Sequence, residues 1–545
     1  MISCRFILKG VISVLTLTLI MSCAQAQSGM VDNSAARCSA VGNSDFSEIQ
    51  DAPTQIIETK LVDRSDVSPA YCEISGYISP SFAFLLRLPT DNWNGKLVQV
   101  GSGGAAGSYV WLEVCEDIVR RGYACITSDG GHRSTTVDFK WAYNNPQAPL
   151  DTYIRAPHVT ALAGKRLVES YYSKAPDKMY FVGCSAGGIQ GLNAAQRFPW
   201  DYDGIFALGP ALSFSDIMMN LEWGNRAYRD SAGTPIFSQA DIELLHKGVV
   251  AKCDLNDGVT DGVIGDPRSC DFNPVELRCT GEKSSRCLSA RQVEAVARIY
   301  KGPVTSKGEQ IAQPTFQKGS EMSWPLYFSD SFNLLGHNID GKYRSFAEEW
   351  FRYGLLQPNP GPAWKVEQFD FDRDYRRIGL GQLIEPLNPD LRAFKRAGGK
   401  LLMATGWSDP VEGVLRTVDY YEAAERLMGG RAITQQFLRL FVVPGADHCG
   451  RGDGPFAIDY LGYLEKWVEQ GIAPDHLIGV HYTATDDPPG RFAEDIWPFA
   501  KLLRNPKIAE FSRPIYPYPT QTRYLGTGDP KDAASFGPVE AKHSR

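Results

Sequence analysis

Short apolar runs, each followed by a glycine-containing loop, recur in two separate parts of this chain. In the first part, residues 96–100, 123–128, 179–183 and 204–209 are expected to form buried strands, with helices over 114–121 and 188–198 between them. After about residue 390 the same pattern returns, with strands over 400–405 and 438–443 and helices over 417–427 and 458–468. Strands that alternate with helices predict parallel strands joined by crossover helices.

The segment between these parts, residues 213–385, has a different pattern. It contains aromatic residues, cysteines and frequent glycine and proline, but it lacks the alternation of strand and helix. We interpret it as a lid domain inserted over the carboxyl edge of the sheet, where open α/β sheets bind their ligands. The two parts of the sheet domain are then residues 27–212 and 386–545.

The N-terminus has the pattern of an export signal. Arg5 and Lys9 precede an apolar stretch over residues 10–21, and Ala24-Gln25-Ala26 provides a small-x-small cleavage site. Residues 1–26 are therefore expected to be a signal peptide, and the mature protein to be secreted or periplasmic. The less favoured alternative is a lipoprotein anchor at Cys23. No later apolar run is long enough to span a bilayer.

Composition and charge narrow the class of partner. With 545 residues, of which 43% are hydrophobic and 22% charged, the chain is globular, and its net charge of −7 gives no basis for nucleic-acid binding. Ten of the twelve cysteines lie outside the signal, which predicts disulfides in an oxidising compartment. Their spacing favours local pairing of Cys253 with Cys270 and of Cys279 with Cys287. Cys38 and Cys72 can staple the N-terminal segment, whereas Cys115 and Cys125 can pair or remain buried thiols.

The most informative motif is Gly183-Cys184-Ser185-Ala186-Gly187, a G-x-S-x-G that follows an expected strand and opens an expected helix. Small residues on both sides of the serine permit a sharp turn that exposes its Oγ atom above the sheet, as in α/β-hydrolases. A plain glycine-rich turn with a capping serine is the alternative. The flanking elements favour Ser185 as a nucleophile and an α/β-hydrolase fold with a large lid.

A serine nucleophile needs a base and a carboxylate, and in this fold they follow it in the order Ser, acid, His. His448 lies in the loop after the last apolar strand, and Asp409 lies directly after the strand over 400–405. Asp447 is the rival acid, but a residue adjacent to the base generally points away from it. His132, in an earlier loop, is expected to stabilise a turn. We therefore predict a Ser185, His448, Asp409 triad.

The oxyanion hole is expected to combine the backbone N–H of Ala186, the residue after the nucleophile, with a second N–H from an early glycine-rich loop. Gly101-Ser102-Gly103-Gly104 follows the first apolar strand of the parallel part and provides such a loop.

These strings together resemble the tannase and feruloyl esterase family. Cys184-Ser185, Asp409 and His448-Cys449 are similar to its CS-D-HC arrangement, and Trp93-Asn94-Gly95-Lys96, Asp129-Gly130-Gly131-His132 and Arg197-Phe198-Pro199 match further family strings. The resemblance implies that Gly104 supplies the second oxyanion donor. It also implies four disulfides: Cys184–Cys449, Cys38–Cys72, Cys253–Cys270 and Cys279–Cys287.

The expected lid carries a run of closely spaced aspartates over residues 253–263. Carboxylates separated by glycines suit a hard cation such as calcium, although an acidic turn would look the same. The resemblance favours a structural calcium site, with its ligands on Asp254, Asp257, Val259, Asp261 and Val263.

The chain departs from the family's terephthalate-ester hydrolases at two places. Tyr516 and Gly537 stand where those enzymes have a C-terminal disulfide, and Gly341 falls near the position of the arginine that binds the terephthalate carboxylate. A group of lid aromatics can either line a binding wall or form plain core: Trp324, Tyr327, Phe328, Phe346, Trp350 and Phe351.

The function that these features imply is hydrolysis of esters of aromatic acids, hydroxycinnamic or gallic, through an acyl-enzyme, with a small-molecule aromatic ester as substrate and no organic cofactor. Hydrolysis of other aromatic esters, such as mono(hydroxyethyl) terephthalate, is the first alternative. A peptidase and a non-catalytic binding protein on the same fold are the others.

Overall fold

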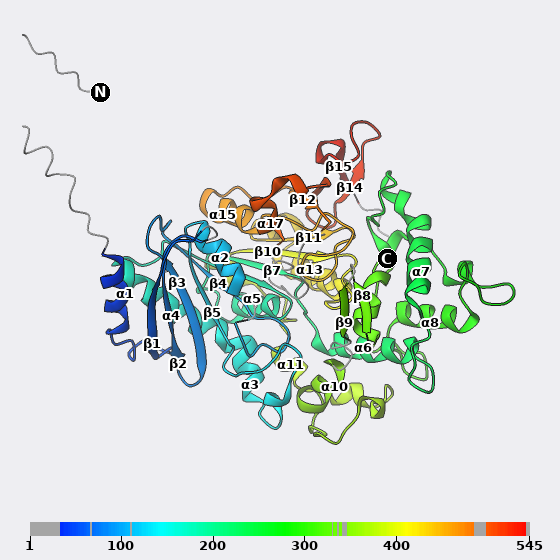
Figure 1. Ribbon diagram of the computed structural model, residues 1–545, viewed down its shortest axis with the longest axis horizontal. Helices are drawn as coiled ribbons and strands as arrows, with labels where there is room; N and C mark the ends of the chain where they lie inside the picture. The colour runs from blue at the N-terminus through cyan, green and yellow to red at the C-terminus, as the bar shows by residue number, and fades with distance from the viewer. Residues whose placement is uncertain are drawn as a thin grey trace, which may run out of the picture.

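The structure is a computed structural model that describes residues 33–65, 68–109, 112–329, 331–334, 337–340, 346–483 and 498–540. The expected signal peptide with Cys23, and Gly341, lie outside the described residues. Figure 1 shows a central sheet flanked by helices, with the N-terminal strands on one side and the segment between β7 and β10 on the other.

The central sheet has nine strands in the order β1-β2-β3-β5-β4-β6-β7-β10-β11. The six strands at one end of this order, β5, β4, β6, β7, β10 and β11, are parallel to one another. At the other end, β1 pairs with β2, β2 with β3 and β3 with β5, each time antiparallel. Their bounds are β1 Thr54–Val62, β2 Tyr71–Ile78, β3 Phe82–Pro89, β4 Lys96–Val100, β5 Ala124–Ser128, β6 Lys178–Cys184, β7 Gly204–Leu208, β10 Lys400–Gly406 and β11 Leu438–Val443.

Helices bury both faces of the parallel strands. Alternate residues of one strand enter different cores: Leu97 packs on one face and Val98 on the other. One core is covered mainly by α1 Ser34–Gly42, α4 Ala156–Tyr172, α5 Ala186–Arg197, α12 Arg392–Arg396 and α13 Val414–Met428, and the other by α2 Leu112–Arg120, α15 Tyr460–Gln470 and α17 Phe499–Arg504. A sheet buried on both faces explains why its strands have continuous apolar runs.

The antiparallel strands at the N-terminal edge were not predicted from the sequence. Only Thr54 of β1 is buried and its other residues are exposed or half-buried, as expected at a sheet edge, so its aliphatic residues do not form a clear buried pattern. Its pairing with β2 is set by the tertiary fold, and the Cys38–Cys72 disulfide, with a Cα–Cα distance of 5.6 Å, fastens α1 to β2.

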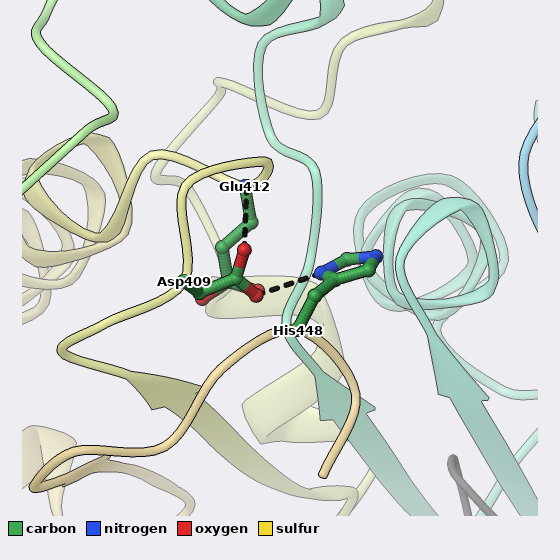
Figure 2. A group of neighbouring side chains, drawn as sticks. All are labelled: Asp409, Glu412 and His448. Carbon is green, nitrogen blue, oxygen red and sulfur yellow. Dashed lines mark hydrogen bonds and ion pairs between the residues drawn. The ribbon is translucent and has the colours of Figure 1, made fainter. Parts of the chain in front are cut away.

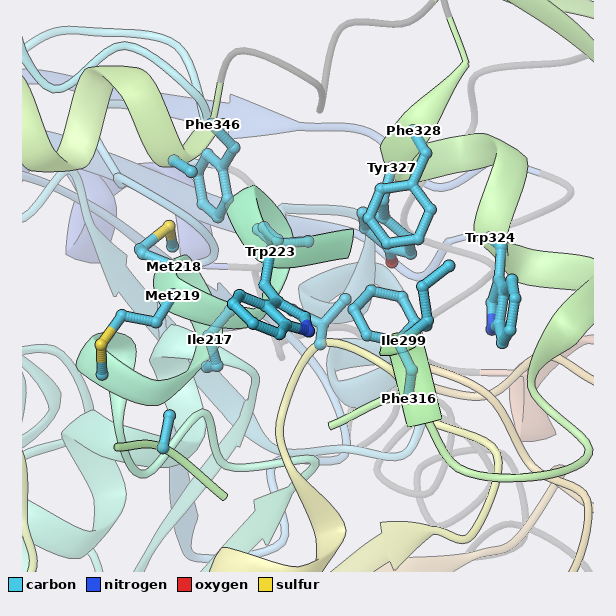
Figure 3. Packing of buried hydrophobic residues seen from close by; sticks show 14 of the residues in the cluster. Ile217, Met218, Met219, Trp223, Ile299, Phe316, Trp324, Tyr327, Phe328 and Phe346 are labelled. Carbon is cyan, nitrogen blue, oxygen red and sulfur yellow. The ribbon is translucent and has the colours of Figure 1, made fainter. Parts of the chain in front are cut away.

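Between β7 and β10 the chain forms a mainly helical unit. Its apolar core, here called the lid core, also includes residues outside this segment, such as Phe139 and Ala186. Figure 3 shows the close packing of its aromatic side chains. Its elements are α6 Phe214–Tyr228, α7 Gln239–Cys253, α8 Ala290–Lys301, α9 Trp324–Phe328, β8 Ser331–Leu334, β9 His337–Asp340, α10 Phe346–Trp350 and α11 Gly381–Ile384.

The six lid aromatics named above are residues of this core. All of them are at most 7% exposed, and Trp324, Trp350 and Phe351 are fully buried. Trp350 stacks on Phe139, with ring centroids 4.0 Å apart. Of the two interpretations left open by the sequence, the structure therefore supports plain core.

The remaining elements lie around the sheet. They are α3 Gln147–Leu150, α14 Arg431–Thr434, β12 Leu477–His481, β13 Phe511–Ile515, β14 Gln521–Tyr524 and β15 Phe536–Val539, where β12 pairs with β13 and β14 with β15. In the described part of the chain, no helix combines the length and the apolar character that crossing a bilayer requires.

Candidate active site

The turn at Ser185 joins β6 to α5. Ser185 has φ 58° and ψ −120°, a left-handed conformation that a non-glycine residue rarely adopts. The glycines beside it allow this turn: a Cβ atom on Gly183 would lie 2.6 Å from the carbonyl of Gly187, and one on Gly187 would lie 2.8 Å from the Ser102 oxygen. Ser185 is partly exposed, whereas its neighbours Cys184 and Ala186 are buried. The sequence therefore folds into the turn that the motif predicted.

Asp409 and His448 meet beyond the ends of two neighbouring strands. β10 and β11 are parallel, so the loops that follow Gly406 and Val443 lie together. The Nδ1 atom of His448 is 2.7 Å from Oδ2 of Asp409, as Figure 2 shows. Asp409 is 1% exposed, and its Oδ1 atom accepts hydrogen bonds from the backbone N–H of Val411 at 2.8 Å. This geometry holds the imidazole in one orientation, with Nε2 left to face a substrate or nucleophile.

Asp447, the rival acid, has different partners. Its Oδ1 atom accepts from the backbone N–H of His448 at 2.6 Å, and its Oδ2 atom accepts from the Ser323 hydroxyl of the lid. It therefore stabilises the histidine loop, and it is Asp409 that contacts the imidazole.

A disulfide joins the nucleophile turn to the histidine loop. Cys184 and Cys449 have a Cα–Cα distance of 5.9 Å and are 265 residues apart in sequence. Cys184 immediately precedes Ser185, and Cys449 immediately follows His448. The bridge therefore limits the separation of the two catalytic candidates without depending on loop packing.

The structure contains the other expected pairs as well. Its disulfides are Cys38–Cys72, Cys115–Cys125, Cys184–Cys449, Cys253–Cys270 and Cys279–Cys287. The Cys115–Cys125 bridge, which the sequence left open, connects α2 to β5.

The glycine-rich loop after β4 packs directly against the nucleophile helix. The backbone N–H of Ser102 donates to Oε1 of Gln190 on α5, at 2.8 Å. Gly104 has φ 56°, and a Cβ atom there would collide with the Thr136 carbonyl oxygen. The Tyr153 hydroxyl donates to the Gly104 carbonyl at 3.1 Å and so orients the loop. Ala186 is the first residue of α5, where a backbone N–H has no partner in the helical ladder.

His132 binds the backbone of this glycine-rich loop at the residue after Gly104. Its Nε2 atom lies 3.0 Å from the Ala105 carbonyl oxygen, and its ring stacks on Trp141 with centroids 3.7 Å apart. Burial lowers the pKa of His132 to about 4. The ring is therefore neutral at physiological pH and donates Nε2–H to Ala105, a turn-stabilising role one residue after Gly104.

Glu412 is a site residue that the sequence reasoning missed. It is 1% exposed and lies three residues after Asp409, with its side chain folded back beside the Asp409 carboxylate (Figure 2). A carboxylate oxygen of Asp409, a carboxylate oxygen of Glu412 and a ring nitrogen of His448 all lie within 4.8 Å of one another. The string Ser-Asp-Pro-Val-Glu gave a signal, a second acid within one turn of the first, but only the fold places it in the interior.

The expected calcium loop follows α7. The Asp254 carboxylate accepts from the backbone N–H groups of Asp261 and Gly262, at 3.2 and 3.0 Å. Burial, together with the negative charges of Asp261 and Asp254, raises the pKa of Asp257 to about 7. Asp261 also forms an ion pair with Arg513, in which its Oδ2 atom lies 2.5 Å from the Nη2 atom. Three carboxylates thus gather in one turn, with a mutual repulsion that a bound cation would relieve.

Comparisons with known proteins identify the family to which the chain belongs. Residues 68–539 match the family model described as tannase and feruloyl esterase. A mono(2-hydroxyethyl) terephthalate hydrolase from Piscinibacter sakaiensis is 32% identical, over 86% of this chain and 84% of that protein. A probable feruloyl esterase B-2 from Aspergillus flavus is 30% identical, over 73% of this chain and 76% of its own length.

Solved structures show the same fold. Feruloyl esterase B from Aspergillus oryzae superposes with a TM-score of 0.76 at 24% identity, covering 93% of this chain and 100% of its own. Tannin acyl hydrolase from Aspergillus niger gives a TM-score of 0.70 at 20% identity, covering 93% and 96%. The α/β-hydrolase fold predicted from the sequence is confirmed. The chain belongs to the tannase and feruloyl esterase family and is a carboxylic ester hydrolase.

Proposed function

We propose that the chain is an exported serine esterase that cleaves esters of aromatic acids, hydroxycinnamic or gallic, through an acyl-enzyme on Ser185. The hydrogen bond between His448 Nδ1 and Asp409 Oδ2 carries this proposal, because it gives the base a fixed orientation. The Cys184–Cys449 bridge supports it, since it ties Ser185 to the same histidine.

In the proposed mechanism, His448 takes the proton of the Ser185 hydroxyl while Oγ attacks the ester carbonyl carbon. The backbone N–H groups of Gly104 and Ala186 stabilise the negative oxygen of the tetrahedral intermediate. His448 then donates the proton to the leaving alcohol, and the acyl-enzyme forms. Water, deprotonated by His448, attacks the acyl carbon and releases the acid and the free Ser185 hydroxyl.

The substrate class rests on the relatives. Those of similar length include a probable feruloyl esterase and a terephthalate monoester hydrolase, both named for aromatic acyl groups. We favour hydroxycinnamic or gallic esters over mono(hydroxyethyl) terephthalate. Gly341 falls near the position of the arginine that binds the terephthalate carboxylate in the related hydrolases, and glycine has no side chain with which to bind it.

Export is supported by the five disulfides, which are typical of oxidising compartments. Cleavage after Ala26 would produce a mature protein that begins at Gln27. Intact mass of the protein isolated from culture medium or periplasm tests this; a diacylglyceryl mass on Cys23 would instead identify a lipoprotein.

We further propose that calcium binds at the Asp254, Asp257 and Asp261 carboxylates, with the Val259 and Val263 carbonyls, as a structural ion. The gathering of three buried or half-buried carboxylates supports this. Elemental analysis after dialysis should find one calcium per chain in the wild type and less in Asp257→Asn. A wild type that retains no calcium at micromolar free ion would contradict the site.

The experiment that tests the catalytic proposal is the initial rate of hydrolysis of methyl ferulate, methyl gallate and mono(hydroxyethyl) terephthalate. Ser185→Ala and His448→Ala should lower kcat by about 10⁴-fold or more, because both act as one unit. His476→Ala is the matched control, since His476 is a partly exposed histidine that contacts its neighbour Asp475 and the ring of Tyr516. Turnover that survives Ser185→Ala would refute the nucleophile, and hydrolysis of none of the esters would favour a binding protein.

A further inference from the structure

Glu412 presents an electrostatic conflict at the centre of the site. Its carboxyl group is 1% exposed, and among the described residues no hydrogen-bond donor reaches either of its oxygen atoms. Its acidic neighbour is the carboxylate of Asp409, an acceptor as well, and one oxygen atom of each group lies within 4.8 Å of the other. Two ionised carboxylates in contact, both shielded from water, would repel strongly, so a shared proton is the low-energy arrangement.

The surroundings of Glu412 keep it in place. Its own backbone N–H donates to Asp409 Oδ1 at 3.2 Å, which closes a short turn and brings the two side chains together. Gly209, after β7, packs against the Glu412 Oε2 atom so closely that a Cβ atom would collide with it. A Cβ atom added to Gly209 would also lie 3.5 Å from Asp409 Oδ2, so both acids are next to this glycine.

Among the described residues, the charged and titratable groups that face Glu412 include no lysine or arginine. They are Asp409 from its own loop, Asp447 and His448 from the loop after β11, and Tyr460 from α15. Burial first, and then the charges of Asp409 and Asp447, raise the pKa of Glu412 well above its ordinary value. Asp409 is already held by two backbone N–H groups and His448, so it is the better-stabilised anion of the two.

We propose that Glu412 is a positioning residue that remains a neutral acid, donates its carboxyl proton to Asp409, and so moderates the negative charge that Asp409 presents to His448. This inference rests on the proposed triad. A fully charged pair would place two negative charges beside the imidazole and keep it protonated, and therefore inactive as a base, to higher pH. The neutral acid leaves one shared charge, which orients His448 and still lets it accept the Ser185 proton.

The test compares the pH dependence of kcat/KM in Glu412→Gln and Glu412→Met. Glutamine is a neutral donor of the same shape. It should leave the midpoint of the acid limb, the low-pH part of the profile where the catalytic base becomes protonated, within about 0.3 pH units of the wild type. Methionine has similar length but no donor, so Asp409 regains its full charge and the acid limb should move up by about 1 pH unit, the equivalent of one hydrogen bond to a charged group.

Two outcomes would overturn the proposal. If Glu412→Gln moves the acid limb down by about 1 pH unit, Glu412 carries a negative charge in the wild type. If Glu412→Met leaves the limb unchanged, Glu412 does not act through Asp409. Glu222→Gln is the control, because it removes another buried carboxyl, one that pairs with Arg226 in the lid, and it should not move the limb.

A second readout does not depend on turnover. In a Ser185→Ala background, NMR titration of the His448 imidazole should show the same upward displacement for Glu412→Met and none for Glu412→Gln. Thermal unfolding of each variant confirms that it is folded. Turnover that survives Ser185→Ala would refute the proposed function, whereas identical imidazole titrations in all Glu412 variants would refute only the role of Glu412.

Discussion

Removal of the Cys184–Cys449 disulfide by the double alanine variant separates its effect on stability from its effect on catalysis. The bridge closes a loop of 265 residues. The chain-entropy relation gives about 5 to 6 kcal/mol of stabilisation for that length, through restriction of the unfolded chain. The bridges Cys253–Cys270 and Cys279–Cys287 lie inside the loop, with separations of 17 and 8 residues. They shorten its free length by at most a tenth, which lowers the figure by only about 0.1 kcal/mol.

The double alanine variant of Cys279 and Cys287 is the control, because it loses the same chemical groups from a bridge that spans only 8 residues and lies in the lid. The same relation gives it about 2.5 kcal/mol. Urea unfolding should therefore rank the two variants, with the Cys184–Cys449 variant losing about twice as much.

Catalysis should distinguish them more sharply. Without the bridge, Ser185 and His448 are held only by their separate loops, and a displacement of about 1 Å costs on the order of 100-fold in rate. We expect kcat/KM for the best ester of the panel to fall about 10- to 100-fold in the Cys184–Cys449 variant and to stay at the wild-type value in the Cys279–Cys287 variant. Equal activity of both folded variants would refute the positioning role of the bridge.

Three further predictions concern the proposed triad, the oxyanion loop and the calcium loop. Asp409→Asn should lower kcat about 10³- to 10⁴-fold by favouring the wrong imidazole tautomer, and an equal loss in Asp447→Asn would contradict the assignment. Gly104→Ala should lower kcat about 100- to 1,000-fold with little change in KM, since the new Cβ displaces an oxyanion donor; unchanged kcat would remove Gly104 from the site. The pKa of Asp257 is raised to about 7, so the stability it confers in the metal-free protein is complete at low pH and is lost as pH rises through 7. Thermal unfolding in chelator should therefore show the melting temperature falling from about pH 4 to 7 and levelling off above 7, and calcium should restore most above pH 7; a pH-independent effect of calcium would contradict this.

The sequence by itself determined the parallel part of the sheet and the three residues of the proposed triad. The buried strands are short apolar runs, and β4 and β11 have the predicted bounds. Ser185 follows from the small residues that its strained turn requires. Asp409 and His448 follow from their positions just after strands, because the carboxyl ends of parallel strands meet at one edge. These features are local in sequence, or follow from one topological rule.

Only the tertiary structure decided what depends on contacts between elements and not on a local sequence pattern. The edge strand β1 has a weak apolar pattern, and it becomes a strand because β2 pairs with it. The bridge between Cys115 and Cys125 required knowing that α2 packs beside β5. The lid aromatics could be assigned to core only once their burial was known. The role of Glu412 could not be predicted from the sequence for the same reason. An acid in a loop is ordinarily solvated, and the proposed effect of Glu412 on Asp409 requires a fold that removes water from both carboxyl groups.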